Sequence, residues 1–367
     1  MVRVLQIVTN MDRGGLETML MNYYRHIDRK KVQFDFLEHR QERAAYDDEI
    51  ESLGGRIYRV PRLDPLSPAY YHALDGFFSS HLEYRIVHSH LDCMSAYPLR
   101  AAKKAGIPVR IAHAHSTSQD KNWKLLFKIA SKRQITRYAT DLFACSADAG
   151  MWMFGTRNVH ILPNAIEADR YTFDQSVRER MRKELGLEDA LVIGHVGRFS
   201  AVKNHSFLLD IFAQVKCREP NSKLLLVGGG SEMQAIRQKS EALGLSGDVV
   251  FTGVRGDVAD LMQAMDVFVF PSLYEGLPVT MVEAQAAGLP CIISDGVPKD
   301  CVITPLVQQI RLSEGSATWA SGVISAAASP RINTYEAVRS AGFDIDTAVR
   351  DLEEYYEKQE IRQSNCG

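Results

Sequence analysis

Two glutamates separated by seven residues, Glu275 and Glu283, form the pair whose type and spacing best suit ligand binding. Glu275 falls in a loop rich in glycine and proline after an apolar run that ends at Phe270, and Glu283 falls in the helix expected next. Each carboxylate accepts several directional hydrogen bonds, so the pair suits a ligand rich in hydroxyl groups, such as a sugar or a ribose. Alternatively, Glu275 is a solvated loop residue and Glu283 is a helix glutamate favoured by the helix dipole.

Two cations five positions apart, Arg198 and Lys203, could hold a diphosphate group. They stand in the stretch 197–204, Gly-Arg-Phe-Ser-Ala-Val-Lys-Asn, directly after an apolar run. The arginine fork binds two oxygens at once, and lysine acts as a mobile point charge. The alternative interpretation is a solvated pair on a surface loop.

Glycines stand where a backbone could approach a ligand closely. Gly14 and Gly15 follow the first apolar stretch of the chain. Gly228 is the first of three consecutive glycines that follow a later apolar stretch. Without a Cβ atom, such residues let main-chain groups come near phosphates or a sugar, but they serve equally in tight turns. For Gly228, a nucleotide contact and a strand-to-helix turn are equally supported.

The elements that must position these residues alternate along the whole chain. Short β-branched runs predict strands at 2–9, 33–37, 56–60, 86–89, 109–114 and 141–144, then at 191–196, 223–227, 249–252, 267–270 and 290–294, with amphipathic stretches between them. This alternation and the length of 367 residues predict the α/β class, with two Rossmann-like, doubly wound domains. Such sheets bind ligands at the carboxyl ends of their strands, where both glutamates can face.

Changes in composition set the expected domain boundaries. We expect a first domain at 1–165, a charged linker at 166–190 and a second domain at 191–340. The segment 341–367 is expected to form a C-terminal helix that packs back towards the first domain.

The overall composition excludes several classes of protein. The chain has 43 basic and 45 acidic side chains and a net charge of −2, whereas a protein that binds nucleic acid through phosphate contacts is far more basic. We therefore expect no nucleic-acid partner. No apolar run is long enough to span a membrane, and the six scattered cysteines include no C-x-x-C pair. A cytoplasmic location without disulfides or structural zinc is expected.

Several segments, in order, resemble motifs of the family-four retaining glycosyltransferases of the GT-B fold. Segment 271–290 fits the pattern P-S-x-x-E-G-x-P-x-x-x-x-E-A-x-A-x-G-x-P, which contains the family's E-x7-E motif, and 197–204 fits its G-R-x-x-x-x-K-N loop. Shorter matches are the glycine loop at 11–17, the strand-to-glycine turn at 226–230 and the strand end at 251–254. The resemblance covers nearly the whole chain. It implies two Rossmann-like domains that face a central cleft, with the acceptor on the first domain and the nucleotide sugar on the second.

The resemblance assigns roles to the four charged residues introduced above. It implies that Glu283 binds the ribose hydroxyls and that Glu275 binds hydroxyls of the donor sugar. Arg198 and Lys203 would hold the diphosphate and stabilise it as it departs. We therefore expect Glu275, Arg198 and Lys203 to act in catalysis.

The resemblance also implies a histidine against the sugar, after a strand of the first domain. His115 fits this place best and is also expected to act in catalysis, and His113, on the same face of the expected strand, is the alternative. Arg255 fits either a contact near the base or an exposed loop. Where the family often has Gly-Gly-x-x-Glu, this chain has Gly-Val-Pro-Lys-Asp at 296–300, so no phosphate contact is assigned there. The other residues implied in nucleotide-sugar binding are Gly14, Gly15, Gly228, Val254, Leu277 and Pro278.

The reaction implied is transfer of a sugar from a nucleoside diphosphate, by preference UDP, to an acceptor hydroxyl with retention of the anomeric configuration. The enzymes resembled most build exopolysaccharide or capsule units, so a glycan or a lipid-linked acceptor is expected. No metal and no other cofactor are expected, because no Asp-x-Asp follows an expected strand. The one at 344–346 fits a turn before the last helix.

Other functions fit the same fold. A nucleotide-sugar 2-epimerase or a non-catalytic sugar-nucleotide binder could use the same residues, since a fold does not fix a function. A Rossmann dehydrogenase would need G-x-G-x-x-G after a strand. Neither the first-domain glycines nor the run at 228–230 provides that spacing.

A basic stretch at 121–137 suggests a peripheral contact with the inner face of a membrane. Its six basic residues recur mostly at three or four positions, and no acidic residue falls between 121 and 140. They would therefore line one face of a helix, which suits an anionic phospholipid surface. The alternative is an ordinary surface helix with a solvated basic face.

Overall fold

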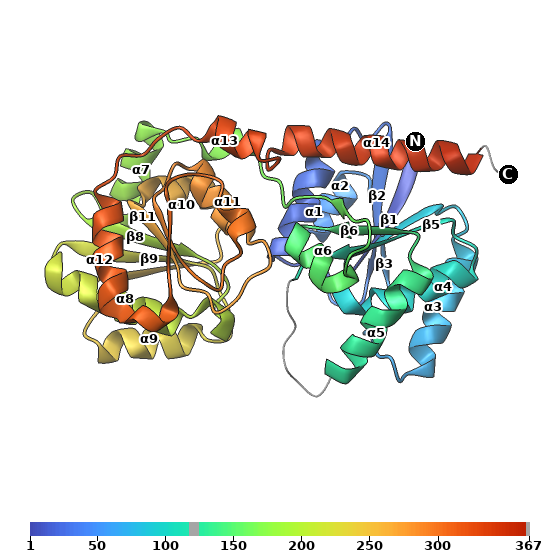
Figure 1. Cartoon of the computed structure of the whole chain (residues 1–367), viewed down its shortest axis with the longest axis horizontal. Helices are drawn as coiled ribbons and strands as arrows, with labels where there is room; N and C mark the ends of the chain where they lie inside the picture. The colour runs from blue at the N-terminus through green and yellow to red at the C-terminus, as the bar shows by residue number, and fades with distance from the viewer. Residues whose placement is uncertain (117–124, 365–367) are drawn as a thin grey trace. The chain divides into compact units, whose positions relative to one another are not determined.

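The computed structural model describes residues 1–116 and 125–364, except for the side chains of 125–128 and 363–364. The chain divides into two compact units (Figure 1). The first unit consists of 1–165 and 345–367, and the second consists of 166–344.

The first unit is built on a parallel sheet. Among the residues described, its seven strands pair in the order β3-β2-β1-β4-β5-β6-β7. Because β1 lies between β2 and β4, the order of the strands reverses there, and the loops after β1 and β4 leave on opposite sides of the sheet. The strands are Val2–Val8 (β1), Val32–Glu38 (β2), Ile57–Arg59 (β3), Ile86–Ser89 (β4), Val109–Ala114 (β5), Asp141–Ala144 (β6) and His160–Ile161 (β7).

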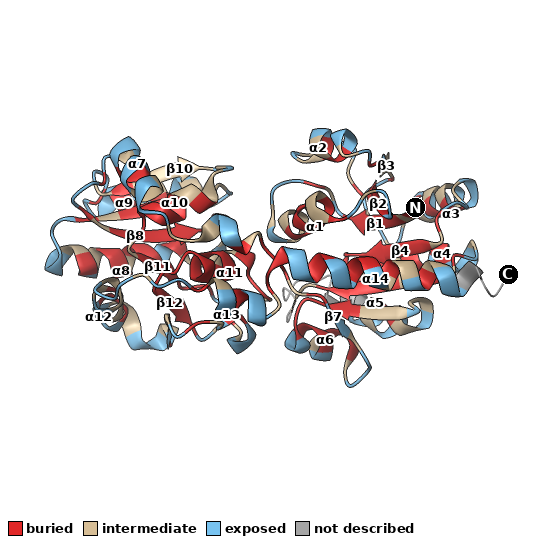
Figure 2. Cartoon of the chain, turned by 90° about the horizontal axis from the view of Figure 1, so that it is seen from above, coloured by how far each residue is buried: buried red, intermediate tan, exposed pale blue. Residues whose placement is uncertain are grey.

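The central strands of this sheet are apolar because helices cover both of its faces. Figure 2 shows the central strands as mostly buried. β2 is buried at every position, including Asp35, whose carboxylate pairs with Arg3 at 2.6 Å. The helices that precede the second unit are Gly15–His26 (α1), Asp47–Ser52 (α2), Pro68–Ser80 (α3), Ala96–Lys104 (α4), Leu125–Tyr138 (α5) and Ala147–Phe154 (α6), with a 3₁₀ turn at Asp92–Ser95 (η1).

The C-terminal helix α14 (Ile345–Ser364) belongs to the first unit. It packs against α1, β1 and β2, and Figure 1 shows it in red beside them. Its buried apolar residues recur mostly at three- and four-residue spacing, so they share one face of the helix. They are Ile345, Ala348, Val349, Leu352 and Tyr356.

The second unit repeats this arrangement. Its six described strands are parallel and pair in the order β10-β9-β8-β11-β12-β13, so the order reverses between β8 and β11. The prediction of two Rossmann-like, doubly wound domains is therefore confirmed. The strands are Leu191–Val196 (β8), Ser222–Val227 (β9), Val249–Gly253 (β10), Val267–Phe270 (β11), Cys291–Ser294 (β12) and Val307–Ile310 (β13).

The segment 166–190, expected to be a linker, lies inside the second unit. It forms a 3₁₀ turn at Ala168–Tyr171 (η2) and the helix α7 (Gln175–Leu185). Arg178 and Arg182 of α7 each pair with Asp266 at 2.5 Å, so charges that suggest a solvated stretch instead attach it to the sheet. The later helices are His205–Arg218 (α8), Met233–Ala242 (α9), Val258–Ala264 (α10), Val279–Ala286 (α11), Gly315–Ala327 (α12) and Tyr335–Ser340 (α13).

Candidate active site

Loops that follow β8, β9 and β11 meet at the carboxyl edge of the second sheet. The Leu273 amide donates to the Val202 carbonyl (2.8 Å), which joins the loop after β11 to the loop after β8. The Phe199 amide donates to the Gly229 carbonyl (2.9 Å), which joins the loop after β8 to the loop after β9. These bonds gather motif residues at the point where the strand order reverses, which is the usual ligand site of a doubly wound sheet.

Lys203 and Glu275 form an ion pair at this edge. Lys203 Nζ lies 2.7 Å from Glu275 Oε1, and the two side chains are 18% and 12% exposed. The ammonium group also lies 4.4 Å from the centre of the Phe270 ring, within cation–π range. The structure thus brings together the lysine and the glutamate that the motifs predicted, on loops that are 72 positions apart in the chain.

Arg198 stands on the same loop as Lys203, directly after β8, and its side chain is exposed. Among the residues described, no carboxylate forms an ion pair with its guanidinium group. This planar group can therefore offer its donors to an anionic ligand without first leaving a protein partner.

Glu283 lies on α11 and is buried, and its Oε1 atom accepts a hydrogen bond from the Tyr171 hydroxyl (2.7 Å). Burial raises the pKa of Glu283 to about 7, and the hydrogen bond from Tyr171 opposes this rise. Tyr171 comes from η2, and no sequence pattern around it pointed to this contact. Its hydroxyl holds the Glu283 side chain in one orientation.

Leu277 and Pro278 lead into α11. Both are buried, and Pro278 is the N-cap residue of the helix. The first amides of a helix lack intrahelical acceptors and favour an anion. The predicted contacts of Leu277 and Pro278 with the donor therefore lie at the N-terminal end of α11, which suits an anionic group.

Gly228 is required by the fold itself. Its φ is +139°, and a Cβ atom there would lie 2.1 Å from the Gly197 carbonyl oxygen. The Gly228 amide donates to the Gly253 carbonyl (2.8 Å). Of the two interpretations of this glycine, the geometry supports the close turn at the end of β9.

Val254 and Arg255 follow β10. The Val254 side chain is exposed. The Arg255 guanidinium lies 2.5 Å from the Asp257 carboxylate and 3.7 Å from that of Glu184. These ion pairs support the interpretation of Arg255 as part of a surface loop.

The segment 296–300, where the sequence departs from the family motif, shapes the Glu275 loop. The Gly296 carbonyl accepts a hydrogen bond from the Glu275 amide (3.0 Å). A Cβ atom at Gly296 would lie 2.2 Å from the Leu273 carbonyl oxygen. This part of the segment therefore supports the site through its backbone.

Gly14 and Gly15 lie at the start of α1 in the first unit. Gly14 is the N-cap residue, and a Cβ atom at Gly15 would meet no described atom within 4 Å. Packing does not explain Gly15, and the open space beside the helix N-terminus suits the close approach of an anionic ligand.

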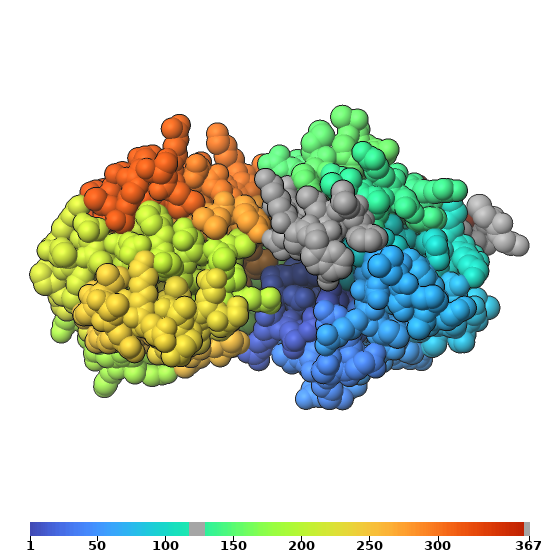
Figure 3. All heavy atoms as spheres, turned by 90° about the horizontal axis from the view of Figure 1, so that it is seen from below, coloured from blue at the N-terminus to red at the C-terminus, as the bar shows by residue number. Residues whose placement is uncertain are grey.

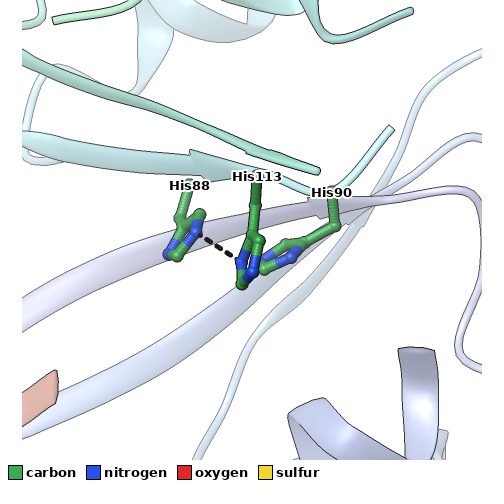
Figure 4. A group of neighbouring side chains, drawn as sticks. All are labelled: His88, His90 and His113. Atoms are coloured by element: carbon green, nitrogen blue, oxygen red, sulfur yellow. Dashed lines mark hydrogen bonds between the residues drawn. The ribbon is translucent and has the colours of Figure 1, made fainter. Parts of the chain in front are cut away.

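His115 follows β5 and is the outermost of four neighbouring histidines. Hydrogen bonds join His88 to His113 (3.1 Å) and His90 to His115 (2.9 Å). The two pairs lie against each other. The rings of His88 and His90 are stacked with their centres 4.3 Å apart, and those of His113 and His115 are tilted with their centres 4.0 Å apart. Figure 4 shows the three buried members, while His115 is half-buried. Of the two histidines proposed from the sequence, His113 lies inside the unit and His115 towards its surface.

The three buried histidines also need to be considered as metal ligands, since each places one nitrogen within 4.8 Å of the others. Zinc binds each imidazole nitrogen at about 2.1 Å. The facing nitrogens of His88 and His113 are hydrogen-bonded to each other at 3.1 Å, so one carries the proton and the other accepts it, and neither offers a lone pair to an ion while that bond is present. Hydrogen bonds therefore explain this part of the arrangement.

Comparison with known proteins identifies the family. The model of group 1 glycosyl transferases matches residues 177–332, and the model of the glycosyl transferase 4-like domain matches residues 14–165. The chain is also 40% identical to the putative glycosyltransferase EpsF of Bacillus subtilis, over 96% of each chain. The chain belongs to the group 1 glycosyltransferases.

Two further comparisons concern a relative with a named activity and a solved structure with bound ligands. It is 27% identical, over 60% of each chain, to the UDP-Gal:alpha-D-GlcNAc-diphosphoundecaprenol alpha-1,3-galactosyltransferase of Escherichia coli. HepE of Anabaena, solved in complex with UDP and glucose, matches 97% of this chain and 100% of its own with a TM-score of 0.81 and 18% identity. The likeness to HepE confirms the GT-B fold of this glycosyltransferase.

Proposed function

We propose that this glycosyltransferase moves a sugar from a UDP-sugar to a hydroxyl of a glycan or lipid-linked acceptor, with retention of configuration, in exopolysaccharide or capsule assembly. The observation that carries the proposal is the Lys203–Glu275 ion pair at the strand-order reversal of the second sheet. It places a cation suited to a diphosphate beside a carboxylate suited to sugar hydroxyls. Glu283, on the helix that follows, supplies an acceptor for the ribose.

The choice of donor and acceptor is supported by the two defined comparisons. HepE was solved with UDP, and the name of the Escherichia coli relative gives UDP-Gal as donor and a diphosphoundecaprenol-linked sugar as acceptor. A binding protein or an epimerase is a weaker proposal, because the family and the relative of 40% identity are both named as transferases.

Retention without a metal ion is part of the proposal. The bond between the anomeric carbon and the diphosphate breaks, the acceptor oxygen bonds to the same face, and the acceptor proton passes to the departing phosphate. Arg198 and Lys203 would stabilise the negative charge that grows on this phosphate. Asp346 lies in the first turn of α14, so the Asp-x-Asp at 344–346 stands at a helix start rather than after a strand.

Product analysis tests this function. We expect the purified protein to extend GlcNAc-diphosphoundecaprenol with labelled sugar from UDP-glucose or UDP-galactose, and EDTA to leave the rate unchanged. The new linkage, read by NMR, should be α. Conversion of the sugar nucleotide to an epimer without acceptor would instead support the epimerase.

The nucleotide is tested separately by thermal unfolding. UDP should raise the melting temperature more than GDP or ADP, because a ligand at 100 times its Kd adds roughly 2.7 kcal/mol of stability. A larger shift with GDP or ADP would contradict the choice of uridine.

Substitutions of the two glutamates should affect different ligands. Glu283→Gln should weaken the binding of bare UDP, because the ribose loses a carboxylate acceptor. Glu275→Gln should leave UDP binding intact or strengthen it, because Lys203 is then released from its ion pair, but it should impair use of the UDP-sugar. Calorimetry and initial rates measure both effects, and equal UDP affinity in wild type and Glu283→Gln would refute the ribose assignment.

UDP affinity should also depend on pH through Glu283. With a pKa of about 7, this group is mostly protonated at pH 6 and mostly ionised at pH 8, and only the ionised form accepts two hydroxyl donors well. Affinity should therefore rise up to about tenfold from pH 6 to pH 8. Because the terminal phosphate of UDP also titrates near pH 6, Glu283→Gln is the matched control, and the wild type should show the steeper rise.

We also propose that the first unit contacts an anionic membrane surface through α5 and α6. No helix in the described ranges combines the length and apolar character needed to cross a bilayer. In Figure 3 the green surface of α6 lies beside the teal-green surface of α5. A groove of about 520 Å³ lies between these helices, lined by Ile129, Lys132, Arg133, Thr136, Met151, Trp152, Met153, Phe154, Gly155 and Arg157.

The residues of this groove combine basic and apolar groups. Lys132 Nζ lies 4.2 Å from the centre of the Trp152 ring, and the side chains of Ile129 and Met151 are 41% and 57% exposed. Basic groups beside exposed apolar ones suit an anionic phospholipid interface. Lys121 and Lys124 of the basic stretch lie outside the described residues, as does the Lys128 side chain.

Liposome co-sedimentation tests the membrane contact. Binding should require anionic lipid, fall as salt rises, and drop when Lys132, Arg133 and Arg157 are changed to Glu, at about 1 kcal/mol per basic residue. The matched control changes Lys30, Arg62 and Lys104, which are exposed elsewhere on the first unit, to Glu and should retain more binding. No sedimentation of the wild type with anionic liposomes at low salt would leave α5 as ordinary scaffold.

A further inference from the structure

A continuous path of hydrogen bonds runs from His115 into the core of the first unit. His115 Nε2 is bonded to His90 Nδ1 (2.9 Å), and His90 Nε2 is bonded to Gln6 Oε1 (2.8 Å). Gln6 Nε2 then donates to the Tyr356 hydroxyl on α14 (3.5 Å). Gln6 and His90 are buried, so water cannot replace these partners.

The polarity of the path follows from Gln6. Its carbonyl oxygen can only accept, so the proton of His90 is on Nε2. A neutral imidazole has one N–H group, and His90 Nδ1 must then accept. The proton between His90 and His115 therefore belongs to His115 Nε2.

The contacts of Tyr356 agree with this polarity. Its hydroxyl lies 2.7 Å from His88 Nδ1 and 3.5 Å from the Gln6 amide. The short contact is typical of a hydroxyl donor, so the tyrosine proton points to His88. The hydroxyl oxygen is then left to accept from the Gln6 amide, which keeps the Gln6 carbonyl facing His90.

We propose that Gln6 and His90 are positioning residues that hold His115 in the neutral Nε2–H tautomer, so that Nδ1 presents a lone pair to the donor sugar. The last step rests on the proposed function together with the expectation, implied by the family resemblance, that His115 faces the donor sugar. In this tautomer His115 accepts a hydrogen bond from a sugar hydroxyl and repels phosphate oxygens. It therefore helps to place the sugar, and not the diphosphate, beside the end of β5.

The charge state of the array is consistent with fixed tautomers. Although the residue His115 is half-buried, desolvation of its ring lowers its pKa to about 3, and burial lowers the pKa of His90 well below its ordinary value. Both rings are then neutral at working pH, and a neutral ring must choose one nitrogen for its proton.

Ring nitrogen NMR tests the tautomer without any need for activity. In protein labelled with ¹⁵N-histidine, long-range proton–nitrogen spectra distinguish a protonated from an unprotonated ring nitrogen, and His115→Gln identifies the signals of His115. We expect His115 to carry its proton on Nε2. A proton on Nδ1 in the wild type would overturn the proposal.

Variants test which residues fix the tautomer. Gln6→Leu and His90→Gln should each give a mixture of the two tautomers at His115. The matched variant Tyr355→Phe removes the hydroxyl of the neighbouring tyrosine on α14, which packs against Phe143 and lies outside the path, and should retain Nε2–H. The first two variants interrupt the hydrogen-bonded path at different residues. If one of them folds poorly, the other still tests the proposal. Retention of the single tautomer in both would overturn the role of Gln6 and His90.

Kinetics connect the tautomer to the reaction. Gln6→Leu and His90→Gln should lower kcat by about two- to tenfold, the scale of one hydrogen bond, and leave UDP affinity unchanged. Full kcat in a variant that shows mixed tautomers would overturn the link to the sugar. If the tautomer is fixed but His115→Gln does not alter use of the UDP-sugar, the placement of His115 against the sugar fails while the hydrogen-bonded path stands.

Discussion

Arg198→Ala and Lys203→Ala should each lower turnover at saturating UDP-sugar by about 10²-fold or more, the scale for losing one preorganised charge donor. Affinity for the UDP-sugar should fall less than turnover, because the charge on the leaving diphosphate grows only as the bond to the sugar breaks. Initial rates and calorimetry on the same preparations measure the two effects.

The ion pair at Lys203 makes its variant the more informative of the two. Lys203→Ala also removes the ammonium group that lies 2.7 Å from the Glu275 carboxylate, whose negative charge then lies close to where the diphosphate would bind. The double variant with Glu275→Gln removes that repulsion and should recover part of the lost UDP affinity, but not the turnover. Lys239→Ala is the matched control, since Lys239 is likewise paired at 2.7 Å, with Asp210, but lies on α9. Normal turnover in both single variants would refute leaving-group stabilisation by this pair.

Gly228→Ala should destabilise the second unit by about 3 kcal/mol or more, through strain at a positive φ and a clash with backbone. The added Cβ atom would meet the Gly197 carbonyl oxygen at 2.1 Å and force the Arg198 loop away from β9. A loss of this size corresponds to a fall of roughly 6–12 °C in melting temperature for a unit of this length.

The neighbouring glycine provides the control for this substitution. A Cβ atom at Gly229 would lie 3.0 Å from a methyl group of Val254, an exposed side chain that can move aside. Gly229→Ala should therefore lower the melting temperature much less than Gly228→Ala. Equal melting temperatures for Gly228→Ala and the wild type would show that this turn tolerates a side chain.

The fold could be predicted because its strands are nearly continuous apolar runs bounded by glycine, proline and polar residues. The edge strand β13 escaped prediction for the opposite reason, since its central residues, Gln308 and Gln309, are polar and exposed. The charged residues of α7 likewise indicated a linker, because only the folded unit brings Asp266 to them.

The site could be predicted where one short segment carries the chemistry, as with Glu275 and Glu283. It could not be predicted where partners come from distant parts of the chain. Tyr171 reaches Glu283 from η2, and Tyr356 reaches His88 from the last helix. A signal did exist for the histidine array: His88 and His90 are two positions apart at the end of β4, as His113 and His115 are at the end of β5.

The second unit interrupts the sequence of the first, and this affects how the enzyme can be dissected genetically. The chain leaves the first unit at Ala165 and rejoins it at Ile345, and the two crossing segments are adjacent, since Ile166 bridges to Asp344. A truncated gene ending at 165 would omit the helix that supplies Tyr356 to the first core. The workable excision removes 166–344 as one piece and splices 165 to 345 through a short linker. A premature stop codon near the end of the gene would therefore remove α14 and destabilise the unit that contains the N-terminal residues.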